Sequence, residues 1–274
     1  MKTIADVMAN RPLNEKVFRL DGKVAVVTGG TGGIGAAICT LFANVGARVA
    51  VVDLDAGQAQ ALADEINAQT SNTGGAAIGI GCDVTREAST LEAVARVVAE
   101  LGRPTVLVNG VAVLDKSGTI LEIDPEEWEK VHRVNIHGYY LMSRAVLPHM
   151  IEAGGGSVIH IASMHGQVGR ANRVSYTSTK GAIMQMGRTM AADHAAQGIR
   201  VNTLSPGAVQ TRRITYRYNG EMPADVRKQV ESKYLLGRMA DPAELATGAL
   251  FLASDASSFM TGSDMLIDGG YCAV

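Results

Sequence analysis

The sequence predicts a single α/β domain in which a parallel sheet of about seven strands is covered by helices on both faces. Short runs that are apolar throughout, such as residues 23–29 (KVAVVTG) and 47–53 (ARVAVVD), alternate with longer amphipathic stretches. Continuous apolar runs are typical of strands buried on both faces, and their alternation with helices indicates parallel pairing. The 31 glycines and the low aromatic content of 4% also favour a fold with many tight turns over an aromatic-rich β-sandwich.

The predicted strands and helices follow one another in order along the chain. Strands are expected over residues 23–29, 47–53, 76–83, 105–109, 156–163, 199–207 and 264–268. Helices are expected over residues 33–45, 56–69, 86–100, 125–150, 173–196 and 241–254. Two of these helices have a clear start, because Asp124-Pro125 and Asp241-Pro242 each supply an N-cap and a proline at the first helical position.

The domain organisation is predicted to be simple. The 274 residues show no linker or change of composition that would divide residues 21–274, and residues 1–20 form an N-terminal extension. Residues 208–237 interrupt the alternation, because they are polar and contain Arg212, Arg213 and Arg217. A long irregular segment beside a strand end is typical of a substrate lid, which is the role that we predict for it.

Charge and cysteine content argue against several classes of protein. The net charge is −2 and no block of basic residues occurs, so nucleic-acid binding is not indicated. Cys39, Cys82 and Cys272 fall in no metal-binding spacing, and neither do the 6 histidines, so no metal site is predicted. No apolar run reaches the ~18 residues of a membrane span, and the N-terminus lacks the apolar core of a signal peptide. A soluble cytoplasmic protein is therefore expected.

A glycine-rich turn follows the first predicted strand. In residues 26–37 (VVTGGTGGIGAA), Gly30, Gly32 and Gly35 satisfy the pattern G-x-G-x-x-G. Gly29 and Gly33 belong to an overlapping pattern, T-G-x-x-x-G-x-G. Such glycines let the backbone approach a pyrophosphate at a helix N-terminus. The turn alone would be weak evidence, but a strand before it and a helix after it indicate a dinucleotide site.

Two acids follow at the ends of the next predicted strands. Asp53 ends the second strand, where a carboxylate can accept hydrogen bonds from both hydroxyls of an adenosine ribose and repels a 2′-phosphate. No Lys or Arg lies in the glycine turn to receive that phosphate, so we predict NAD as the cofactor and NADP as less favoured. Asp83 is expected beside the adenine, although an acid at that place is often a helix cap or simply solvated.

Residues 174–183 (VSYTSTKGAI) place Tyr176 and Lys180 four residues apart, on one face of a predicted helix. Hydride transfer from a secondary alcohol requires a base for the hydroxyl proton, and a tyrosine with an ordinary pKa of about 10 is a poor base. A neighbouring ammonium favours the phenolate. Ser163, at a predicted strand end, can donate a hydrogen bond to the reacting oxygen. Taken alone, Tyr and Lys at this spacing are usually ordinary surface neighbours.

In combination, these motifs resemble the short-chain dehydrogenases/reductases, in their classical subgroup. The resemblance covers roughly residues 20–271 and implies a Rossmann-like, doubly wound fold. It is carried by TGGTGGIG at 28–35, Asp53, Asp83, Asn109, Asn135, Ser163, Tyr176-x-x-x-Lys180, Pro206-Gly207, Thr211 and MTGSDMLIDGGY at 260–271.

The resemblance implies four catalytic residues. Tyr176 matches the general acid/base, and Lys180 matches the lysine that activates this tyrosine and holds the nicotinamide ribose. Ser163 matches the serine that binds the reacting oxygen, and Asn135 matches the asparagine that anchors a proton-relay water. The family likeness also implies a homotetramer, with a homodimer as the alternative.

The same resemblance assigns the cofactor site to the glycine turn, to the ends of three strands, to the Tyr/Lys pair and to the segment after the sixth strand. Its residues are Gly29, Thr31, Gly32, Gly33, Ile34, Gly35, Asp53, Leu54, Asp83, Val84, Asn109, Gly110, Tyr176, Lys180, Pro206, Gly207, Val209 and Thr211. The chain departs from the family pattern at 109–112, where Asn-Gly-Val-Ala replaces the usual Asn-Asn-Ala-Gly. Gly110 therefore changes the wall near the cofactor ribose.

The substrate is predicted in outline. His165, Arg212 and Arg213 could meet a carboxylate, phosphate or sulfonate, although lid arginines can equally be solvated or lie between subunits. Polar pocket candidates favour a sugar, polyol or hydroxy acid. One alternative is a 3-oxoacyl-thioester reductase, which Asp53 disfavours because such enzymes usually use NADPH. Another is an NAD-binding regulatory or scaffold protein, which would be expected to lack some of the four catalytic residues.

Overall fold

Seven parallel strands form one sheet in the computed structural model, which describes residues 15–70, 73–215 and 221–274. The strand order is β3-β2-β1-β4-β5-β6-β7. The strands are β1 (Val24–Thr28), β2 (Arg48–Asp53), β3 (Ala76–Gly81), β4 (Val106–Asn109), β5 (Gly156–Ile161), β6 (Ile199–Pro206) and β7 (Asp264–Ile267). The predicted α/β class and the parallel sheet are confirmed, and every predicted strand is present with only small shifts of its ends.

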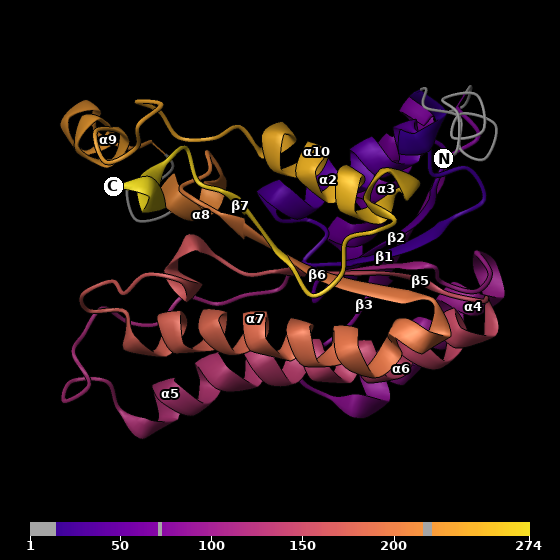
Figure 1. Ribbon diagram of the computed structural model, residues 1–274, viewed down its shortest axis with the longest axis horizontal. Helices are drawn as coiled ribbons and strands as arrows, with labels where there is room; N and C mark the ends of the chain where they lie inside the picture. The colour runs from indigo at the N-terminus through magenta and orange to yellow at the C-terminus, as the bar shows by residue number, and fades with distance from the viewer. Residues whose placement is uncertain (1–14, 71–72, 216–220) are drawn as a thin grey trace, which may run out of the picture.

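Helices cover both faces of this sheet (Figure 1). One layer contains α2 (Gly33–Asn44), α3 (Ala56–Thr70) and α10 (Pro242–Ala253), and the other contains α4 (Glu87–Glu100), α6 (Gly138–Glu152) and α7 (Val174–His194). Successive residues of β1 divide between the two layers, as the alternation of side chains along a strand requires. Ala25 and Val27 join the core under α2, whereas Val24 and Val26 join the core under α4 and α6.

The single helix predicted over 125–150 is instead two helices joined by a π-helical turn. α5 (Pro125–His132) begins as predicted, with the Asp124 carboxylate accepting a hydrogen bond from the Glu127 amide at 2.8 Å. Arg133–His137 form the π-turn η2, and α6 follows directly. A π-turn fits one extra residue into a helix and occurs frequently at functional sites. Here it carries Asn135.

The predicted lid segment, residues 208–237, is not irregular throughout. Among its described residues, α8 covers Arg212–Thr215 and α9 covers Ala224–Glu231. Asp225 lies in the first turn of α9, where the helix dipole favours an acid. A short polar helix has too few apolar residues to show a helical period, so the sequence pattern did not reveal it. In the predicted N-terminal extension, Glu15–Phe18 form the 3₁₀ turn η1, and residues 1–14 lie outside the described residues.

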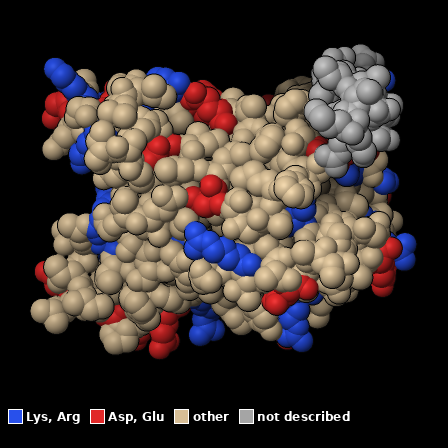
Figure 2. All heavy atoms as spheres, viewed as in Figure 1, with Lys and Arg blue, Asp and Glu red and all other residues tan. Residues whose placement is uncertain are grey.

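The surface carries charges of both signs. Figure 2 shows acidic and basic side chains interspersed over one face, most of which is formed by other residues. Within residues 15–70, 73–215 and 221–274, no helix has the length and apolar character needed to cross a membrane. The described residues also include no group of three or more His, Cys, Asp or Glu side chains arranged to hold a metal ion.

The strand order creates a topological switch point between β1 and β4 at the centre of the sheet. β1 and β4 are neighbours, and Thr28 pairs with Asn109 at their carboxyl ends. From β1 the chain proceeds to β2 and β3 on one side, and from β4 it proceeds to β5, β6 and β7 on the other. The loops after β1 and β4 therefore diverge, and ligands bind at such a switch point in doubly wound sheets.

Candidate active site

The glycine turn after β1 forms a tight backbone cradle. Gly29 has a φ of +66°, which side chains rarely adopt. A Cβ on Gly35 would lie 2.1 Å from the carbonyl oxygen of Gly29, so only glycine fits there. Gly32 is the N-cap of α2, and Gly33 and Ile34 are the first two residues of the helix. No described side chain makes a capping hydrogen bond at this helix start. Backbone amides at an uncapped helix N-terminus suit a pyrophosphate, so the cradle fits a dinucleotide.

Asp53 ends β2, as predicted, and contacts the glycine turn. Thr31 donates two hydrogen bonds to Asp53 Oδ2, from its backbone amide at 3.0 Å and from its hydroxyl at 2.6 Å. The Leu54 amide donates to Asp53 Oδ1 at 2.8 Å. These three bonds fix the orientation of the carboxylate that is predicted to bind the adenosine ribose.

Leu54 and Asp83 line the same open groove of about 460 Å³. Asp83 lies two residues beyond the end of β3, and Thr85 donates to its Oδ1 from the hydroxyl at 2.7 Å and from the amide at 3.0 Å. These bonds hold the pKa of Asp83 below its ordinary value. Val84 is buried, and a Cβ on Gly138 of α6 would lie 2.7 Å from its Cγ2, so its side chain belongs to the core. An adenine contact by Asp83 remains a prediction.

Asn109 and Gly110 shape the end of β4. Asn109 Nδ2 lies 3.2 Å from both Ser143 Oγ and His160 Nδ1, so this buried side chain ties β4 to α6 and β5. The Gly110 amide donates to Thr28 Oγ1 at 3.0 Å, and a Cβ on Gly110 would lie 2.7 Å from the Thr28 carbonyl oxygen. Glycine at the place of the usual asparagine therefore lets the ends of β1 and β4 approach closely.

Lys180 is buried in α7, with an exposed fraction of 2%. Its Nζ donates to the backbone carbonyl of Ile161 at 2.8 Å and lies 5.6 Å from the ring centroids of both Tyr176 and Tyr139. A buried ammonium is costly unless it is bonded, and the faces of neighbouring aromatic rings attract it. The burial of Lys180 therefore excludes the alternative that Tyr176 and Lys180 are exposed surface neighbours.

Asn135 is fully buried and bridges the loop after β4 to α7. Its Oδ1 accepts from the Val113 amide at 2.8 Å, and its Nδ2 donates to the Val113 carbonyl at 3.0 Å. The same Nδ2 lies 3.2 Å from Thr179 Oγ1, one residue before Lys180. The Asn135 side chain thus fixes a wall of the site against α7. Its predicted role as the anchor of a proton-relay water remains a prediction.

Ser163 and His165 follow β5. Ser163 Oγ accepts from the His165 amide at 3.2 Å, and its hydroxyl retains a proton to donate, as the predicted role requires. His165 is buried, with its Nε2 3.2 Å from Arg170 Nη1. Burial and the Arg170 charge lower the pKa of His165 to about 4. The ring is therefore neutral at pH 7, and His165 cannot attract an anionic substrate as a cation.

The segment after β6 leads back to the glycine turn. β6 ends at Pro206, and Val209 forms a parallel bridge with Ala240. Thr211 lies against the start of α2, because a Cβ on Gly33 would be 2.5 Å from Thr211 Cγ2. This placement agrees with a segment that closes over a bound dinucleotide.

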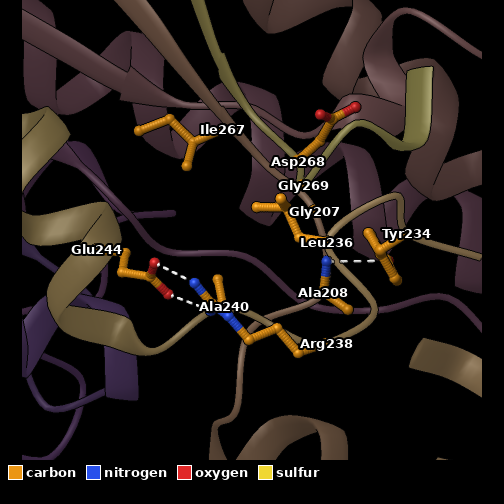
Figure 3. Close-up of a pocket in the computed structure, with 10 residues that line it drawn as sticks. All are labelled: Gly207, Ala208, Tyr234, Leu236, Arg238, Ala240, Glu244, Ile267, Asp268 and Gly269. Atoms are coloured by element: carbon orange, nitrogen blue, oxygen red, sulfur yellow. Dashed lines mark hydrogen bonds and ion pairs between the residues drawn. The ribbon is translucent and has the colours of Figure 1, made fainter. Parts of the chain in front are cut away.

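A cavity of about 40 Å³ lies at the base of segment 208–237, lined in part by Gly207 and Tyr234 (Figure 3). The Ala208 amide donates to Tyr234 Oη at 3.0 Å, which joins the two ends of the segment. Just beyond it, Arg238 binds Glu244 of α10 through two nitrogens, at 2.7 and 2.8 Å. A cavity of this size has room for water but not for a nucleotide or a polyol.

Comparison with known proteins decides the family. A family model described as enoyl-(acyl carrier protein) reductase matches residues 29–272. The chain is 41% identical to D-threitol dehydrogenase of Mycolicibacterium smegmatis, over 93% of this chain and 94% of that protein. It is 35% identical to a short-chain type dehydrogenase/reductase from Mycobacterium marinum, whose solved structure matches with a TM-score of 0.86 over 94% of this chain and 99% of that chain. The chain belongs to the short-chain dehydrogenases/reductases.

A further solved structure supports the same assignment. Gluconate 5-dehydrogenase from Burkholderia cenocepacia J2315, in complex with NADP and tartrate, matches with a TM-score of 0.87 and 31% identity, over 94% of this chain and 98% of that chain. The family predicted from the sequence is therefore confirmed. So is the predicted class of reaction for this short-chain dehydrogenase/reductase, oxidation or reduction at a CH–OH group.

The predicted substrate residues of this dehydrogenase are placed only in part. Arg212 begins α8 with an exposed side chain, and Arg213 follows it in the same helix. Arg217 lies outside the described residues. The substrate roles of Arg212 and Arg213 therefore remain predictions. His165 has Arg170 as its basic neighbour, and no motif in the sequence indicated this arginine.

Three further residues lie at this site although no motif in the sequence predicted them. Asp115 and Arg173 form a buried ion pair beside Tyr176, with Asp115 Oδ1 and Arg173 Nη1 3.2 Å apart. Tyr139 of α6 is also buried, and its hydroxyl donates to the Ile161 carbonyl at 2.9 Å. Each contact joins segments that are far apart in the chain, so local spacing could not have revealed it.

Proposed function

We propose that the protein is an NAD-dependent dehydrogenase that interconverts a secondary alcohol and a ketone in a small polyhydroxylated molecule, such as a polyol, a sugar or a hydroxy acid. The observation that carries the proposal is the buried ammonium of Lys180, bonded to the Ile161 carbonyl and 5.6 Å from the Tyr176 ring. A buried cation beside a tyrosine at the end of a strand favours the phenolate needed for proton transfer.

Each residue has a distinct role in the proposed reaction. Tyr176 accepts the proton of the substrate hydroxyl during oxidation and returns it during reduction. The Lys180 ammonium stabilises the phenolate, and the Ser163 hydroxyl donates to the substrate oxygen as its charge changes. When bound, NAD supplies the hydride acceptor. The glycine turn and Asp53 are the groups that would hold it.

NAD is proposed over NADP because of the charge at the end of β2. The Asp53 carboxylate is fixed by the amide and hydroxyl of Thr31, next to the place of the adenosine ribose. A 2′-phosphate there would meet a negative charge, and residues 29–35 contain no Lys or Arg to offset it. The gluconate dehydrogenase of similar structure was solved with NADP, so the preference has to be measured for this chain.

Two similar proteins support the substrate class. One is named for D-threitol, and the other is named for gluconate and holds tartrate. All three molecules are short chains with several hydroxyl groups. In this protein Ser163 and the neutral His165 follow β5, the strand whose Ile161 carbonyl accepts from Lys180, and they offer hydrogen-bonding groups suited to hydroxyls.

The test is a panel of substrates with NAD and NADP, in which NADH or NADPH formation is followed by absorbance. We expect the highest kcat/KM with NAD and a polyol or hydroxy acid. Tyr176→Phe is expected to lower kcat by about 1,000-fold, because general acid–base catalysis contributes 10²–10⁴-fold. Activity confined to steroids or long-chain alcohols would overturn the substrate class, and a Tyr176→Phe variant that keeps its turnover would overturn the mechanism.

A second candidate function is reduction of an acyl thioester, which is favoured by the description of the matching family model. The same assay run in reverse, with 3-oxoacyl and enoyl thioesters and with NADH or NADPH, distinguishes it. Asp53 disfavours this candidate because such reductases usually use NADPH. Turnover of thioesters without turnover of any polyol would replace the first proposal with the second.

We also propose a cytoplasmic homotetramer. Leu266 on the edge strand β7, Phe259 just before it, and Tyr140 and Ile151 on α6 are exposed apolar side chains, which suit subunit contacts. Three free cysteines and the use of NAD are consistent with a reducing compartment. Light scattering coupled to gel filtration measures the assembly, and the mass of a single chain would contradict the tetramer and the dimer alike.

A further inference from the structure

A buried ion pair lies immediately before α7. Arg173 Nη1 is 3.2 Å from Asp115 Oδ1 and donates to the backbone carbonyl of Asp115 at 2.7 Å. The two side chains are 8% and 0% exposed. Moving two charges out of water costs several kcal/mol, and apolar residues in their place are often equally stable. Stability alone therefore does not account for this pair.

The second oxygen of the Asp115 carboxylate binds the start of α7. Asp115 Oδ2 accepts a hydrogen bond from the backbone amide of Tyr176 at 3.0 Å. Arg173 is the N-cap of α7, and its side chain makes no capping bond. Asp115, from another segment, thus supplies the acceptor that a Ser or Asp at the N-cap normally provides. The positive end of the helix dipole also favours its charge.

Further contacts fasten the same two segments together. Gly118 forms a parallel bridge with Arg173, and its amide donates to the Asn172 carbonyl at 3.2 Å. Asn172 has a φ of +61°, and the described residues contain no other non-glycine with a positive φ. Two residues before Asp115, Val113 is held by both polar atoms of the Asn135 side chain. Residues 113–118 are therefore fixed to Asn135 at one end and to the start of α7 at the other.

The charge of Arg173 also reaches the site. Burial and Arg170 are the main causes of the lowered pKa of His165, and Arg173 adds to their effect. A change of charge at Arg173 is therefore felt at His165, in addition to the hold of Asp115 on the backbone of Tyr176. Within the pair, Asp115 and Arg173 neutralise each other.

We propose that Asp115 and Arg173 are positioning residues of the dehydrogenase, which together fix the start of α7 and so place the Tyr176 hydroxyl relative to Asn135 and Ser163. The proposal rests on the proposed function, because it takes Tyr176 as the proton acceptor. Asp115 holds the Tyr176 amide, and Arg173 orients the Asp115 carboxylate through its side chain and its backbone. A displacement of about 1 Å at a reacting group can lower a rate by about 100-fold.

The experiment measures kcat, KM and the pH dependence of polyol oxidation for Asp115→Asn, Arg173→Gln and the double variant, each in the full-length protein. Each single variant is expected to lower kcat by about 10- to 100-fold. The KM for NAD is expected to change less than about threefold, because the glycine turn and Asp53 belong to β1, α2 and β2 and only part of the proposed NAD site lies on α7.

The acidic limb of the pH–rate profile separates positioning from simple destabilisation. In Asp115→Asn the Arg173 charge is unbalanced and favours the phenolate, so the limb moves to lower pH. In Arg173→Gln the Asp115 charge is unbalanced, so the limb moves to higher pH. In the double variant the side chains at positions 115 and 173 are both uncharged, so no charge is left unbalanced. Its acidic limb is expected to return to the wild-type position.

Asp241→Ala is the matched control. Asp241 caps α10 through a bond from the Ala243 amide to Oδ1 at 2.8 Å. Its loss is expected to lower the urea midpoint of unfolding while kcat and the acidic limb stay unchanged. Hydrogen exchange of Asp115→Ala provides a readout that needs no turnover, with faster exchange expected at residues 174–177 than in wild type.

Either of two kinetic results would overturn the proposal: single variants that keep kcat within about twofold, or acidic limbs that move in the same direction. Unchanged exchange at residues 174–177 in Asp115→Ala would also overturn it. A wild-type protein that oxidises no alcohol would instead overturn the proposed function. Faster exchange in Asp115→Ala would then still support the role of Asp115 as the cap of α7.

Discussion

Lys180 and Tyr139 donate hydrogen bonds to one acceptor, the backbone carbonyl of Ile161. The Nζ–O distance is 2.8 Å and the Oη–O distance is 2.9 Å. Ile161 ends β5, so side chains from α7 and α6 meet at this strand end. The Tyr139 ring in turn lies 5.5 Å from the ring of His160, which is fully buried. The ammonium proposed to activate Tyr176 is thus held by α6 and β5 as well as by its own helix.

The first prediction concerns the ring of Tyr139. Tyr139→Leu removes the aromatic face 5.6 Å from Lys180 Nζ, whose attraction for a buried cation is about 2 kcal/mol, so kcat is expected to fall by up to about 30-fold. Tyr139→Phe keeps that face and loses one buried hydrogen bond, which costs about 1 kcal/mol of stability with a smaller effect on kcat. Tyr140→Phe is the control, because Tyr140 is exposed. Equal kcat in Tyr139→Leu and wild type would show that the ring does not hold Lys180 in its active position.

The second prediction concerns the glycine turn. A Cβ on Gly35 would lie 2.1 Å from the Gly29 carbonyl oxygen, so Gly35→Ala forces the turn to move. We expect the Kd for NADH, measured by fluorescence titration, to rise by about 30-fold or more, which corresponds to about 2 kcal/mol. Gly169→Ala is the control, because no atom lies within 4 Å of its added Cβ. Wild-type affinity in Gly35→Ala would contradict the assignment of this turn as the pyrophosphate site.

The parts of the fold that were predicted correctly depend on local pattern. Buried strands are apolar along their whole length, and β1 shows this in residues 24–27, all of which are buried. The glycine turn is also a local feature, since the Gly29 and Gly35 backbones meet within a single turn. Asp53 was placed correctly because it ends a strand, and the end of a strand fixes the edge of the sheet to which its side chain belongs.

The parts that were missed depend on contacts between distant segments. Asp115 and Arg173 lie 58 residues apart, and nothing near either residue marks it as half of an ion pair. The π-turn at 133–137 has the composition of an ordinary helix, and it forms where Asn135 bonds to Val113 and Thr179. The lowered pKa of His165 comes from burial and from Arg170, and neither cause can be read from a histidine in a sequence. Tertiary contacts therefore decided the electrostatics of the site.

The third prediction concerns cofactor preference. Asp53→Asn keeps the shape of the side chain and an oxygen for the Thr31 bonds, but it removes the charge that would repel a 2′-phosphate. We expect the ratio of kcat/KM for NAD to that for NADP to fall by about tenfold or more, equivalent to about 1.4 kcal/mol. Asp64→Asn, an exposed acid on α3, is the control. A wild-type protein that prefers NADP, or a ratio unchanged by Asp53→Asn, would contradict the role assigned to Asp53.

The last prediction concerns stability in acid. Burial lowers the pKa of His160 to about 3 and is the main cause that lowers that of His165 to about 4, whereas an unfolded histidine has a pKa of about 6.5. Below pH 6.5 the unfolded chain therefore binds protons that the folded chain does not bind. The free energy of unfolding is expected to fall by up to about 1.4 kcal/mol per pH unit for each of these histidines, down to their folded pKa values, with no contribution above about pH 7.

Urea unfolding at about pH 7.5 and about pH 5 measures this loss. In His160→Gln one of the two titrating groups is gone, so the part of the pH dependence that these histidines contribute is expected to fall by about half. The variant itself is expected to be less stable at both pH values, because His160 is fully buried against Asn109 and Tyr139. His137→Gln, which changes an exposed histidine, is expected to keep the wild-type pH dependence. Equal pH dependence in His160→Gln and wild type would mean that His160 does not resist protonation in the folded protein.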